Sequence, residues 1–365
     1  MQPLSIAELD QLVRRYFTAE LWLTEGSLPA YILQPSPNMK ERFRGLYQAL
    51  RPLGLAPLLR REEGRLVLRL IPLPKRRRGG RKLLALMLFL ATLATILAAG
   101  YVITLDPLLT RLDEAVALNP LPHLVGYAVC MAGVVGVHEL GHMAACRAHG
   151  IKSSPPYFIP FPPISAFPVG TLGAVIMQED PPLSRDTLFD IGISGPLLGF
   201  AASLMASAVG LALSHPVSEG LLEEYLEGGG VLLPIPLIYR VLIPAFNPGL
   251  EEAAAICLHP IAWAGWVGLL ITFLNAFPAA QLDGGHVLRA LLSERLHVAL
   301  SAVFVAVMFL TGFWAMALVA AALTLRRHPG ALDDATPLSF KRRLGVLALI
   351  AMWLASLPFP PLLWP

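Results

Sequence analysis

Two histidines and a glutamate with the spacing of a metal site lie inside an apolar stretch of the chain. His138, Glu139 and His142 form the pattern His-Glu-x-x-His. On a helix, positions i and i+4 lie on one face, so the two histidines can bind one metal ion together. Glu139 then stands beside the metal as a proton acceptor for bound water. Residues 115–137 contain no Asp, Glu, Lys or Arg. Ionisable groups at the end of such a stretch are costly, so we interpret them as functional.

Two histidines do not complete a catalytic zinc site, which usually takes three protein ligands and leaves a fourth position open. The favoured third ligand is Asp283, which follows a run without formal charge (253–282) and is expected at the same membrane depth as the histidine pair. Two glycines after Asp283 allow the backbone to turn tightly beside another helix. Alternatively, Asp283 caps a helix over 287–292. His286 and His259 are weaker ligand candidates.

The composition is that of an integral membrane protein. The mean hydropathy is +0.62, 55% of the residues are hydrophobic and only 15% are charged. The net charge of +3 is small, and the basic residues flank apolar runs, so nothing supports nucleic-acid binding. Cys130, Cys146 and Cys257 form no Cys-x-x-Cys pair, and we interpret them as small buried apolar residues.

Apolar runs predict a polytopic α-helical membrane protein with about six transmembrane helices. The predicted spans are 83–105, 124–146, 187–213, 258–278, 298–325 and 344–358. The basic residues in 75–82 place the start of the first span in the cytoplasm by the positive-inside rule. The basic residues between the last two spans conflict with that rule in a simple six-span arrangement. Either 298–325 is a short helical hairpin, which would remove the conflict, or the charge rule does not hold here.

We predict three parts along the chain: a small cytoplasmic α/β domain (1–74), a basic juxtamembrane linker (75–82) and a membrane-embedded domain (83–365). Apolar spacing in the first part predicts helices over 6–17 and 39–50. It also predicts a hairpin of strands 56–61 and 65–71 around Gly64. This part contains no metal cluster, phosphate loop or nucleophile constellation in its sequence. A docking or regulatory role and a purely structural role are equally supported.

A proline-rich segment follows the second predicted span. Residues 155–182 contain eight prolines, which is too broken a pattern for a spanning helix. Apolar β-forming residues around Gly170 and Gly173 predict a β-hairpin or re-entrant loop. Such a segment is tolerated at membrane depth only where protein or a wet cavity surrounds it. The alternative is an ordinary cytoplasmic loop.

A second motif makes a resemblance to a known family clear. Asn275-Ala276-Phe277-Pro278 is followed by Leu282-Asp283-Gly284. Together with His-Glu-x-x-His, this motif resembles the site-2 protease family of intramembrane zinc metalloproteases. The segments 170–173, 190–196 and 259–266 and the N-terminal part are similar to the EGY-type branch of plants, cyanobacteria and other prokaryotes.

The resemblance implies one Zn²⁺ per chain, an active site and a substrate. Its implied site residues are the metal ligands His138, His142 and Asp283, the water-activating Glu139, the substrate- or transition-state-supporting Asn275 with Pro278, and the substrate-contacting β element Gly170, Thr171, Leu172 and Gly173. The implied function is cleavage of transmembrane segments of single-pass membrane proteins within the lipid bilayer. A regulatory partner at residues 1–74 is a further expectation.

Three alternatives remain on the residues alone. A different type of membrane zincin would take Glu219 or Glu223 as its third ligand, which requires an inverted topology. A metal-ion transporter would use Glu139, Asp190 and Asp283 as a permeation path. A catalytically inactive scaffold of the same fold is the third.

The location is predicted from the first residues of the chain. They have no apolar signal segment, and they are not the Arg- and Ser-rich, acid-poor stretch of a transit peptide. The first internal span is therefore expected to direct insertion. We predict a prokaryotic cytoplasmic membrane.

Overall fold

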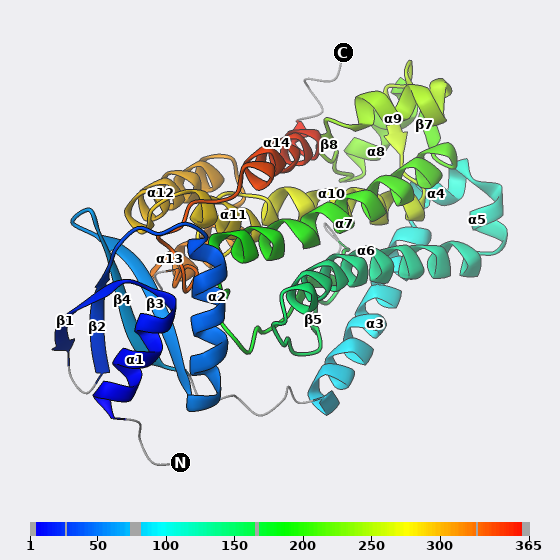
Figure 1. Cartoon of the computed structure of the whole chain (residues 1–365). Coiled ribbons are helices and arrows are strands. Elements are labelled where there is room, and N and C mark those ends of the chain that lie inside the picture. Colours follow the sequence, from blue (N-terminus) through cyan, green and yellow to red (C-terminus); the bar gives the residue numbers. More distant parts are fainter. Residues whose placement is uncertain (1–4, 26–27, 74–81, 165–167, 326–327, 360–365) are drawn as a thin grey trace.

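The computed structural model describes residues 5–25, 28–73, 82–164, 168–325 and 328–359. A small sheet with two helices lies at one end of the molecule, and a long helical body makes up the rest (Figure 1). Of the predicted basic linker, only Lys82 falls within the described residues, and it begins the first long helix. Phe167, part of the predicted β segment, lies outside them.

The N-terminal part is built from two helices and an antiparallel sheet in the order β1-β2-β4-β3. Its elements are α1 (Ile6–Tyr16), β1 (Ala19–Glu25), β2 (Leu28–Leu33), α2 (Met39–Leu50), β3 (Leu55–Glu62) and β4 (Arg65–Pro72). The predicted helices and the β3–β4 hairpin are confirmed, whereas β1 and β2 were not predicted. Glu63 and Gly64 have φ of 48° and 81°, the left-handed values that a type I′ turn requires. The domain boundary at residue 74 stays a prediction.

Apolar side chains hold these helices to the sheet. Val13 of α1 and Leu46 of α2 are fully buried in one cluster with Tyr31 and Leu68 of the sheet. Full burial of such a side chain contributes about 1.5–3 kcal/mol. Leu332, from a segment far along the chain, belongs to the same cluster. The N-terminal part is therefore packed onto the helical body.

Three helices of the body are long and apolar enough to cross a membrane: α3 (Lys82–Thr104), α6 (Leu121–Ala148) and α7 (Arg185–Ala212). Two more apolar helices are shorter, α10 (Pro260–Asn275) and α13 (Trp314–Leu325). The predicted helical membrane body is thus confirmed, but the count of six spans is not. Within the described residues, turns divide the later apolar runs into pieces below the usual spanning length of about 20 residues.

Shorter elements complete the body. The helices are α4 (Pro107–Leu112), α5 (Glu114–Leu118), α8 (Glu219–Glu227), α9 (Tyr239–Phe246), α11 (Asp283–Leu291), α12 (Glu294–Leu310) and α14 (Phe340–Ala355). The strands form three two-stranded antiparallel pairs: β5 (Tyr157–Pro160) with β6 (Thr171–Val175), β7 (His215–Val217) with β9 (Ala255–Cys257), and β8 (Ile235–Pro236) with β10 (Pro358–Phe359). The β5–β6 pair confirms the predicted hairpin in the proline-rich segment.

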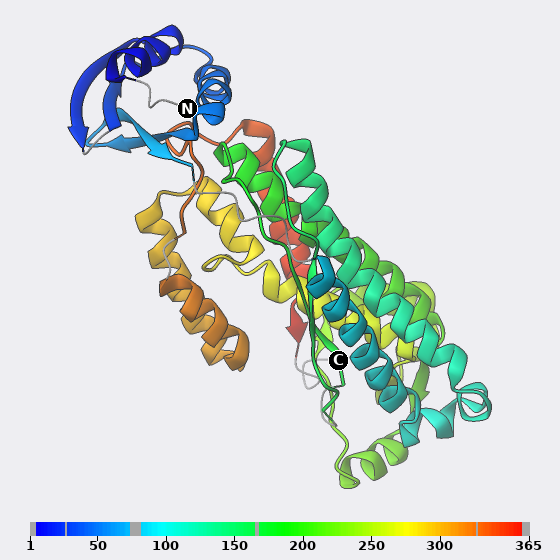
Figure 2. The same ribbon diagram turned by 90° about the horizontal axis from the view of Figure 1, so that it is seen from below.

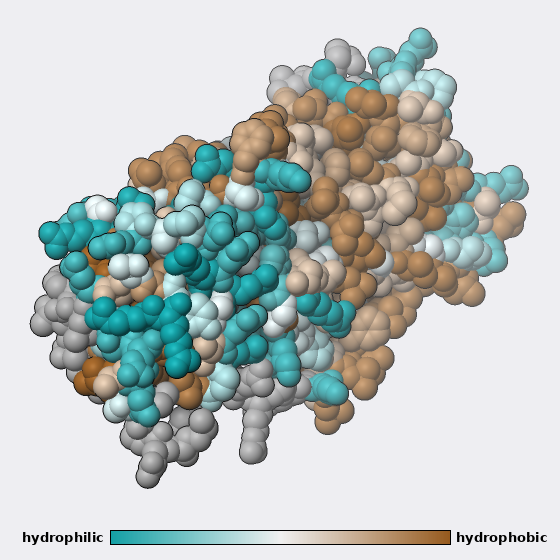
Figure 3. Space-filling model, in the orientation of Figure 1, coloured by the Kyte–Doolittle hydropathy of each residue, from teal (hydrophilic) through white to brown (hydrophobic). Residues whose placement is uncertain are grey.

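The surface divides in the same way as the fold. Polar residues cover the N-terminal end in Figure 3, and apolar residues cover most of the helical body on this face. On α3, Leu83, Leu86 and Leu90 are each more than half exposed. Large exposed apolar side chains on a long helix are expected where lipid, and not water, is the neighbour. The pattern agrees with a membrane-embedded helical body.

The predicted span 298–325 is a helical hairpin. Helix α12 ends at Leu310, and α13 starts at Trp314. Gly312 between them has φ of 87°, the left-handed conformation that commonly ends a helix. The two helices pack on each other beside the rest of the body (Figure 2, ochre and orange). The chain after α13 therefore returns to the side of the N-terminal sheet, which resolves the charge conflict.

Close helix contacts position the centre of the body. Helix α7 packs on both α6 and α10. A Cβ at Gly210 of α7 would overlap the backbone of Ala262 in α10, and a Cβ at Gly265 of α10 would lie 2.5 Å from Ser207 N of α7. Small residues allow membrane helices to approach closely, where van der Waals packing and hydrogen bonds hold them.

Candidate metal centre

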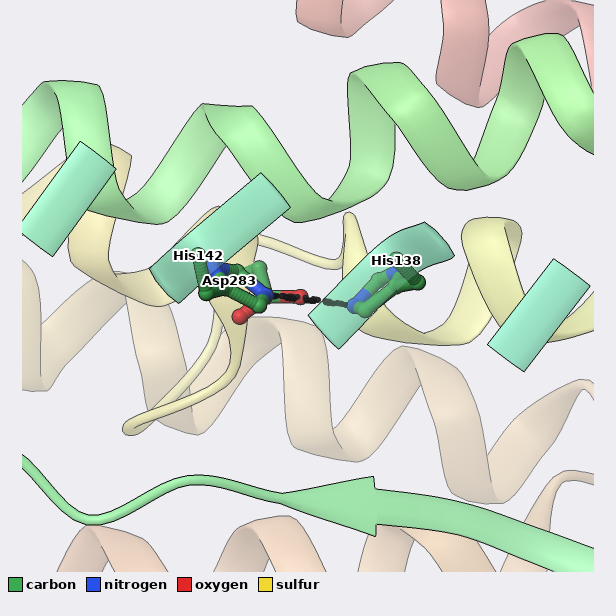
Figure 4. A group of neighbouring side chains, drawn as sticks. All are labelled: His138, His142 and Asp283. Carbon is green, nitrogen blue, oxygen red and sulfur yellow. Dashed lines mark hydrogen bonds and ion pairs between the residues drawn. The ribbon is translucent and has the colours of Figure 1, made fainter. Parts of the chain in front are cut away.

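Three side chains from two elements converge inside the body (Figure 4). His138 and His142 come from α6, and Asp283 is the first residue of α11. Asp283 Oδ2 lies 3.2 Å from His138 Nε2 and 3.4 Å from His142 Nε2. The two Nε2 atoms are 3.2 Å apart. The histidines are 5% and 7% exposed, so the centre is buried.

The local sequence explains the position of Asp283. A Cβ at Gly284 would overlap the carbonyl oxygen of Ala276, and one at Gly285 would lie 2.5 Å from the carbonyl oxygen of Ala279. The two glycines therefore let α11 pack against the segment that precedes it, as predicted. The helix begins at Asp283 and not at residue 287, and its N-cap is Leu282. The alternative that Asp283 caps a helix over 287–292 does not describe this arrangement.

Helix α7 orients the histidines. The Nδ1 atom of His142 donates a hydrogen bond of 2.7 Å to the carbonyl oxygen of Ile191. This contact fixes the proton on Nδ1 and leaves the Nε2 lone pair directed at the centre, as a metal ligand requires. A Cβ at Gly195 would overlap His142 Nε2, and one at Gly199 would lie 2.8 Å from His138 Nδ1. The two glycines form the wall of the centre.

The roles of Ile191 and Gly199 were not predicted from the sequence. The carbonyl of Ile191 carries no side-chain signal, because any residue type supplies it. Gly195 and Gly199 have the Gly-x-x-x-Gly spacing of close helix contacts in membranes, which would have indicated the wall.

The donor set fits zinc. Four ligands at about 2.0 Å around a tetrahedral zinc ion lie about 3.3 Å from one another. The three donor atoms here are separated by 3.2, 3.2 and 3.4 Å. Two imidazole nitrogens and one carboxylate oxygen are a typical protein set for a catalytic zinc, with a fourth position left over.

Glu139 lies next to this centre. It follows the first histidine on α6, it is 5% exposed, and it interacts electrostatically with His142 and Asp283. A buried carboxylate in this position can accept and donate a proton beside the three donor atoms. The geometry therefore agrees with the predicted placement of Glu139.

The predicted substrate element lies along α3. In the β5–β6 hairpin, Gly170 has φ of 79°, and its Cβ would lie 2.6 Å from the Cα of Ile96 in α3. Thr95 Oγ1 donates a 2.7 Å hydrogen bond to the Gly170 carbonyl. Thr171 is buried, whereas Leu172 is 60% exposed. Within the described residues, β6 pairs with β5 alone, so its other edge is open.

Asn275 and Pro278 lie where α10 ends and the chain turns towards α11. Asn275 is the last residue of α10, and both side chains are half-buried. No described contact joins them to the three converging side chains, so their roles stay predictions.

The remaining candidates lie elsewhere. Glu219 and Glu223 are exposed on α8, whose Glu224 pairs with Arg111 of α4. His259 bonds to His123 at the start of α6, and His286 bonds to His328. Asp190 is paired with His149 and Arg342. The structure thus brings together His138, His142 and Asp283, and none of the alternative ligands joins them.

A buried His-His-Asp cluster that could hold a metal ion, set in a helical body with membrane-spanning helices, is the arrangement of a membrane-embedded metalloprotein. Residues 126–319, more than half of the chain, match the family model described as Peptidase family M50. The chain belongs to this family, which is the site-2 protease family that the motifs indicated. No solved structure matches the chain.

Similar proteins place the chain near the EGY-type branch. It is 30% identical over 248 residues to "Probable zinc metalloprotease EGY2, chloroplastic" of Arabidopsis thaliana, covering 64% of this chain and 41% of that protein. It is 33% identical over 228 residues to "Probable zinc metalloprotease EGY1, chloroplastic" of Oryza sativa subsp. japonica, covering 56% and 37%. The chain therefore spans less than half the length of these relatives. The expected family is confirmed, and these relatives are named as probable zinc metalloproteases.

The predicted location was wrong. These relatives, and the EGY3 protein of Arabidopsis thaliana, are named as chloroplastic, which points to a plastid membrane and not to a prokaryotic cytoplasmic membrane. The length of an apolar span reflects the thickness of the bilayer, and the charge of its flanking loops reflects its orientation. Those properties do not distinguish a plastid membrane from a bacterial one, so the sequence pattern could not identify the compartment.

Proposed function

We propose that the chain is an intramembrane zinc metalloendopeptidase that cleaves transmembrane segments of single-pass membrane proteins, with His138, His142 and Asp283 as the metal ligands. One observation carries the proposal. Three donor atoms converge at 3.2–3.4 Å, the separation that tetrahedral zinc requires, and two of them belong to α6, a helix that is apolar enough to cross a membrane.

Each residue of the centre has a distinct role in this proposal. When bound, zinc supplies a Lewis acid that lowers the pKa of water and polarises a peptide carbonyl. The carboxylate of Glu139 takes a proton from the attacking water and returns it to the leaving amine. His142 is held in one tautomer by Ile191, so it presents Nε2 without rearrangement. Asn275 and Pro278 are proposed to support the substrate beside the centre.

The β6 edge is the proposed docking site for the substrate. A transmembrane helix hides its carbonyls in intrachain hydrogen bonds, so a segment must unwind before it can be cut. Adding the unwound segment to an open strand edge restores those bonds in apolar surroundings. We propose that residues 170–173 supply this edge, because within the described residues β6 pairs on one side only and because Leu172 is exposed.

The metal site is tested without a substrate. We would purify the wild-type protein, Asp283→Ala and Glu139→Gln in detergent and measure zinc per chain. About one zinc in the wild type and in Glu139→Gln, with most of it lost in Asp283→Ala, is the expected result. Full retention of zinc in Asp283→Ala would exclude the proposed ligand set.

The substrate edge is tested after a cleavable substrate has been found. Proline at position 172, 173 or 174 removes a backbone N–H from the edge strand. Turnover is expected to fall while the zinc content stays at the wild-type level. Leu172→Ala, which keeps the N–H, is the matched control. Normal turnover in all three proline variants would reject strand addition.

A further inference from the structure

A short segment joins the N-terminal sheet to the helices around the metal centre. Residues 328–336, called the strap here, lie between α13 and α14. The strap runs beside the blue N-terminal sheet in Figure 2 before the chain enters α14. Its contacts reach three different parts of the fold.

On one side, the strap extends the N-terminal sheet. Leu59 N of β3 donates to the Leu332 carbonyl at 2.9 Å, and Asp334 N donates to the Leu59 carbonyl at 3.1 Å, which forms a parallel bridge. The guanidinium of Arg60 donates to the Ala331 and Leu332 carbonyls at 2.8 and 3.0 Å. The Leu332 side chain is buried in the core of the N-terminal part. The strap therefore pairs with the β3 edge through one isolated parallel bridge.

On its other side, the strap binds the segment that leads into α7. Leu332 N donates to the Pro182 carbonyl at 2.9 Å, and Asp333 N donates to the Leu183 carbonyl at 3.0 Å. Arg185, the first residue of α7, donates to Asp334 Oδ1 at 3.1 Å. Helix α7 supplies the carbonyl and the glycine wall that hold the histidines. One hydrogen-bonded ribbon thus connects β3, the strap and α7.

The third contact is with α11, which carries Asp283 at its first position. Arg289 of α11 is 1% exposed, and its guanidinium binds both carboxylate oxygens of Asp334, at 3.0 and 2.6 Å. Gly330 N donates to His328 Nδ1 at 2.9 Å, so the proton of His328 is on Nε2. That N–H donates to His286 Nδ1 at 2.7 Å. Two contacts therefore hold the helix that presents Asp283.

We propose that the strap couples the N-terminal sheet to the metal centre, with His328 and Asp334 as positioning residues. Through α11 they hold Asp283 at the separation that the histidine pair requires. Through Arg185, Asp334 also holds the start of α7. A partner that displaces the strap from the β3 edge would loosen both supports at once. This inference rests on the proposed ligand set, and it assigns the N-terminal part a regulatory role.

The decisive readouts are zinc affinity and the visible absorption of the Co²⁺-substituted protein, which reports the geometry of the ligands. His328→Leu removes the donor to His286, which is not itself a proposed ligand, and we expect zinc affinity to fall by up to about tenfold, the lower end of what loss of a ligand's own hydrogen-bond partner costs. The Co²⁺ bands are expected to shift. His328→Gln, whose amide can still donate, is expected to restore most of the affinity.

Coupling to the sheet is tested on neighbouring residues of β3. Arg60→Met removes the side-chain bonds to the strap, whereas Arg61→Met removes an exposed arginine. We expect the Co²⁺ spectrum and zinc affinity to change in Arg60→Met alone. His215→Leu, which removes a histidine paired with Asp113 at the opposite end of the body, is the matched control for His328→Leu.

The outcomes separate the two proposals. Wild-type zinc affinity and Co²⁺ spectra in both His328→Leu and Arg60→Met, with loss of zinc in Asp283→Ala, would overturn the coupling and leave the metal site standing. Absence of zinc from the wild type would overturn the metal site and the coupling with it. A lower melting temperature with unchanged affinity would show that the strap is structural alone. Asp334→Asn leaves Arg289 buried without its charge partner and is expected to fold poorly. The comparison of His328→Leu with His328→Gln is therefore the decisive test.

Discussion

Helix α6 carries histidines near both ends, and among the described residues only those near its last turns belong to the candidate metal centre. His138 and His142, near its last turns, converge with Asp283. His123, in its first turn, bonds to His259 at 2.8 Å, and Asp113 and His215 form an ion pair nearby on the same side. Both ends thus combine histidines with an aspartate. Among the described residues, three donor atoms converge only at the end that carries His138 and His142.

The two ends of α6 differ in how the ring nitrogens of their histidines are hydrogen-bonded to the backbone. At the candidate metal centre, the Ile191 carbonyl accepts a hydrogen bond from His142 Nδ1–H. The Nε2 lone pair of His142 is therefore available to a metal ion. At the other end, Ile261 N donates to His259 Nδ1, which places the proton of His259 on Nε2. That proton is directed to His123 Nδ1, so the lone pairs of this pair serve hydrogen bonds. The backbone contacts therefore leave the Nε2 lone pair of His142 available at the candidate metal centre, whereas at the other end they occupy the Nδ1 lone pair of His259.

The largest expected effect is on zinc. His142→Ala removes a ligand, and zinc affinity is expected to fall by more than the roughly 100-fold that loss of an outer partner costs. His259→Ala leaves the three converging side chains intact, so its zinc content should equal that of the wild type. Metal analysis of both purified variants makes the comparison. Zinc loss in His259→Ala would show that the two ends are not independent.

The second effect tests the wall. A Cβ at Gly195 would overlap His142 Nε2, so Gly195→Ala is expected to displace the ring and lower zinc affinity at least about tenfold. Gly133 of α6 has nothing within 4 Å of its Cβ position. Gly133→Ala should therefore bind zinc normally and, because Ala favours a helix, unfold no more easily than the wild type. Equal zinc affinity in both alanine variants would mean that α7 gives way at Gly195.

Local sequence patterns predicted the residues of the candidate site, but they did not predict the contacts that surround it. The histidine spacing and the glycines after Asp283 are readable because each reflects the geometry of a single segment. Ile191 and the strap contacts of Arg289 and His328 depend on which segments pack together, and no periodicity in the sequence encodes that.

The errors of fold have physical causes as well. An unbroken apolar run over 298–325 satisfies the length of a span, but Gly312 ends the first helix within it. The conflict of the following basic residues with the charge rule was the signal for the hairpin. Strands β1 and β2 were missed although the Gly26-Ser27 pair between them is a turn signal, because Pro29 inside β2 weakens the strand pattern.

A smaller effect is expected on stability. The His259 side chain caps α10 by accepting from Ile261 N at 3.2 Å. His259→Ala removes the cap and is expected to lower the free energy of unfolding by about 1 kcal/mol. His259→Asn, which restores a capping oxygen, should recover most of it. Thermal unfolding of the three proteins in one detergent measures the difference, and equal melting temperatures would argue against a capping role.

The smallest effect concerns Asp113, at the same end as His259. Burial opposes ionisation of its carboxyl, but hydrogen bonds from His215 and from the amides of Val116 and Ala115 outweigh it and lower the pKa of Asp113. A carboxyl whose pKa is lower in the folded state contributes stability above its unfolded pKa and loses it as the pH falls through the folded pKa.

Asp113→Asn keeps an oxygen for the cap of α5 and removes the charge. We expect the substitution to lower the free energy of unfolding at pH 6 by less than about 1 kcal/mol, as for other partly exposed ion pairs. The melting temperature at pH 6 should fall accordingly. The deficit should shrink as the pH falls below the ordinary carboxyl range, because the wild-type carboxylate then becomes protonated as well. Zinc content should stay at the wild-type level at pH 6. A deficit that persists unchanged in acid would assign the effect of Asp113 to its shape and hydrogen bonds, and not to its charge.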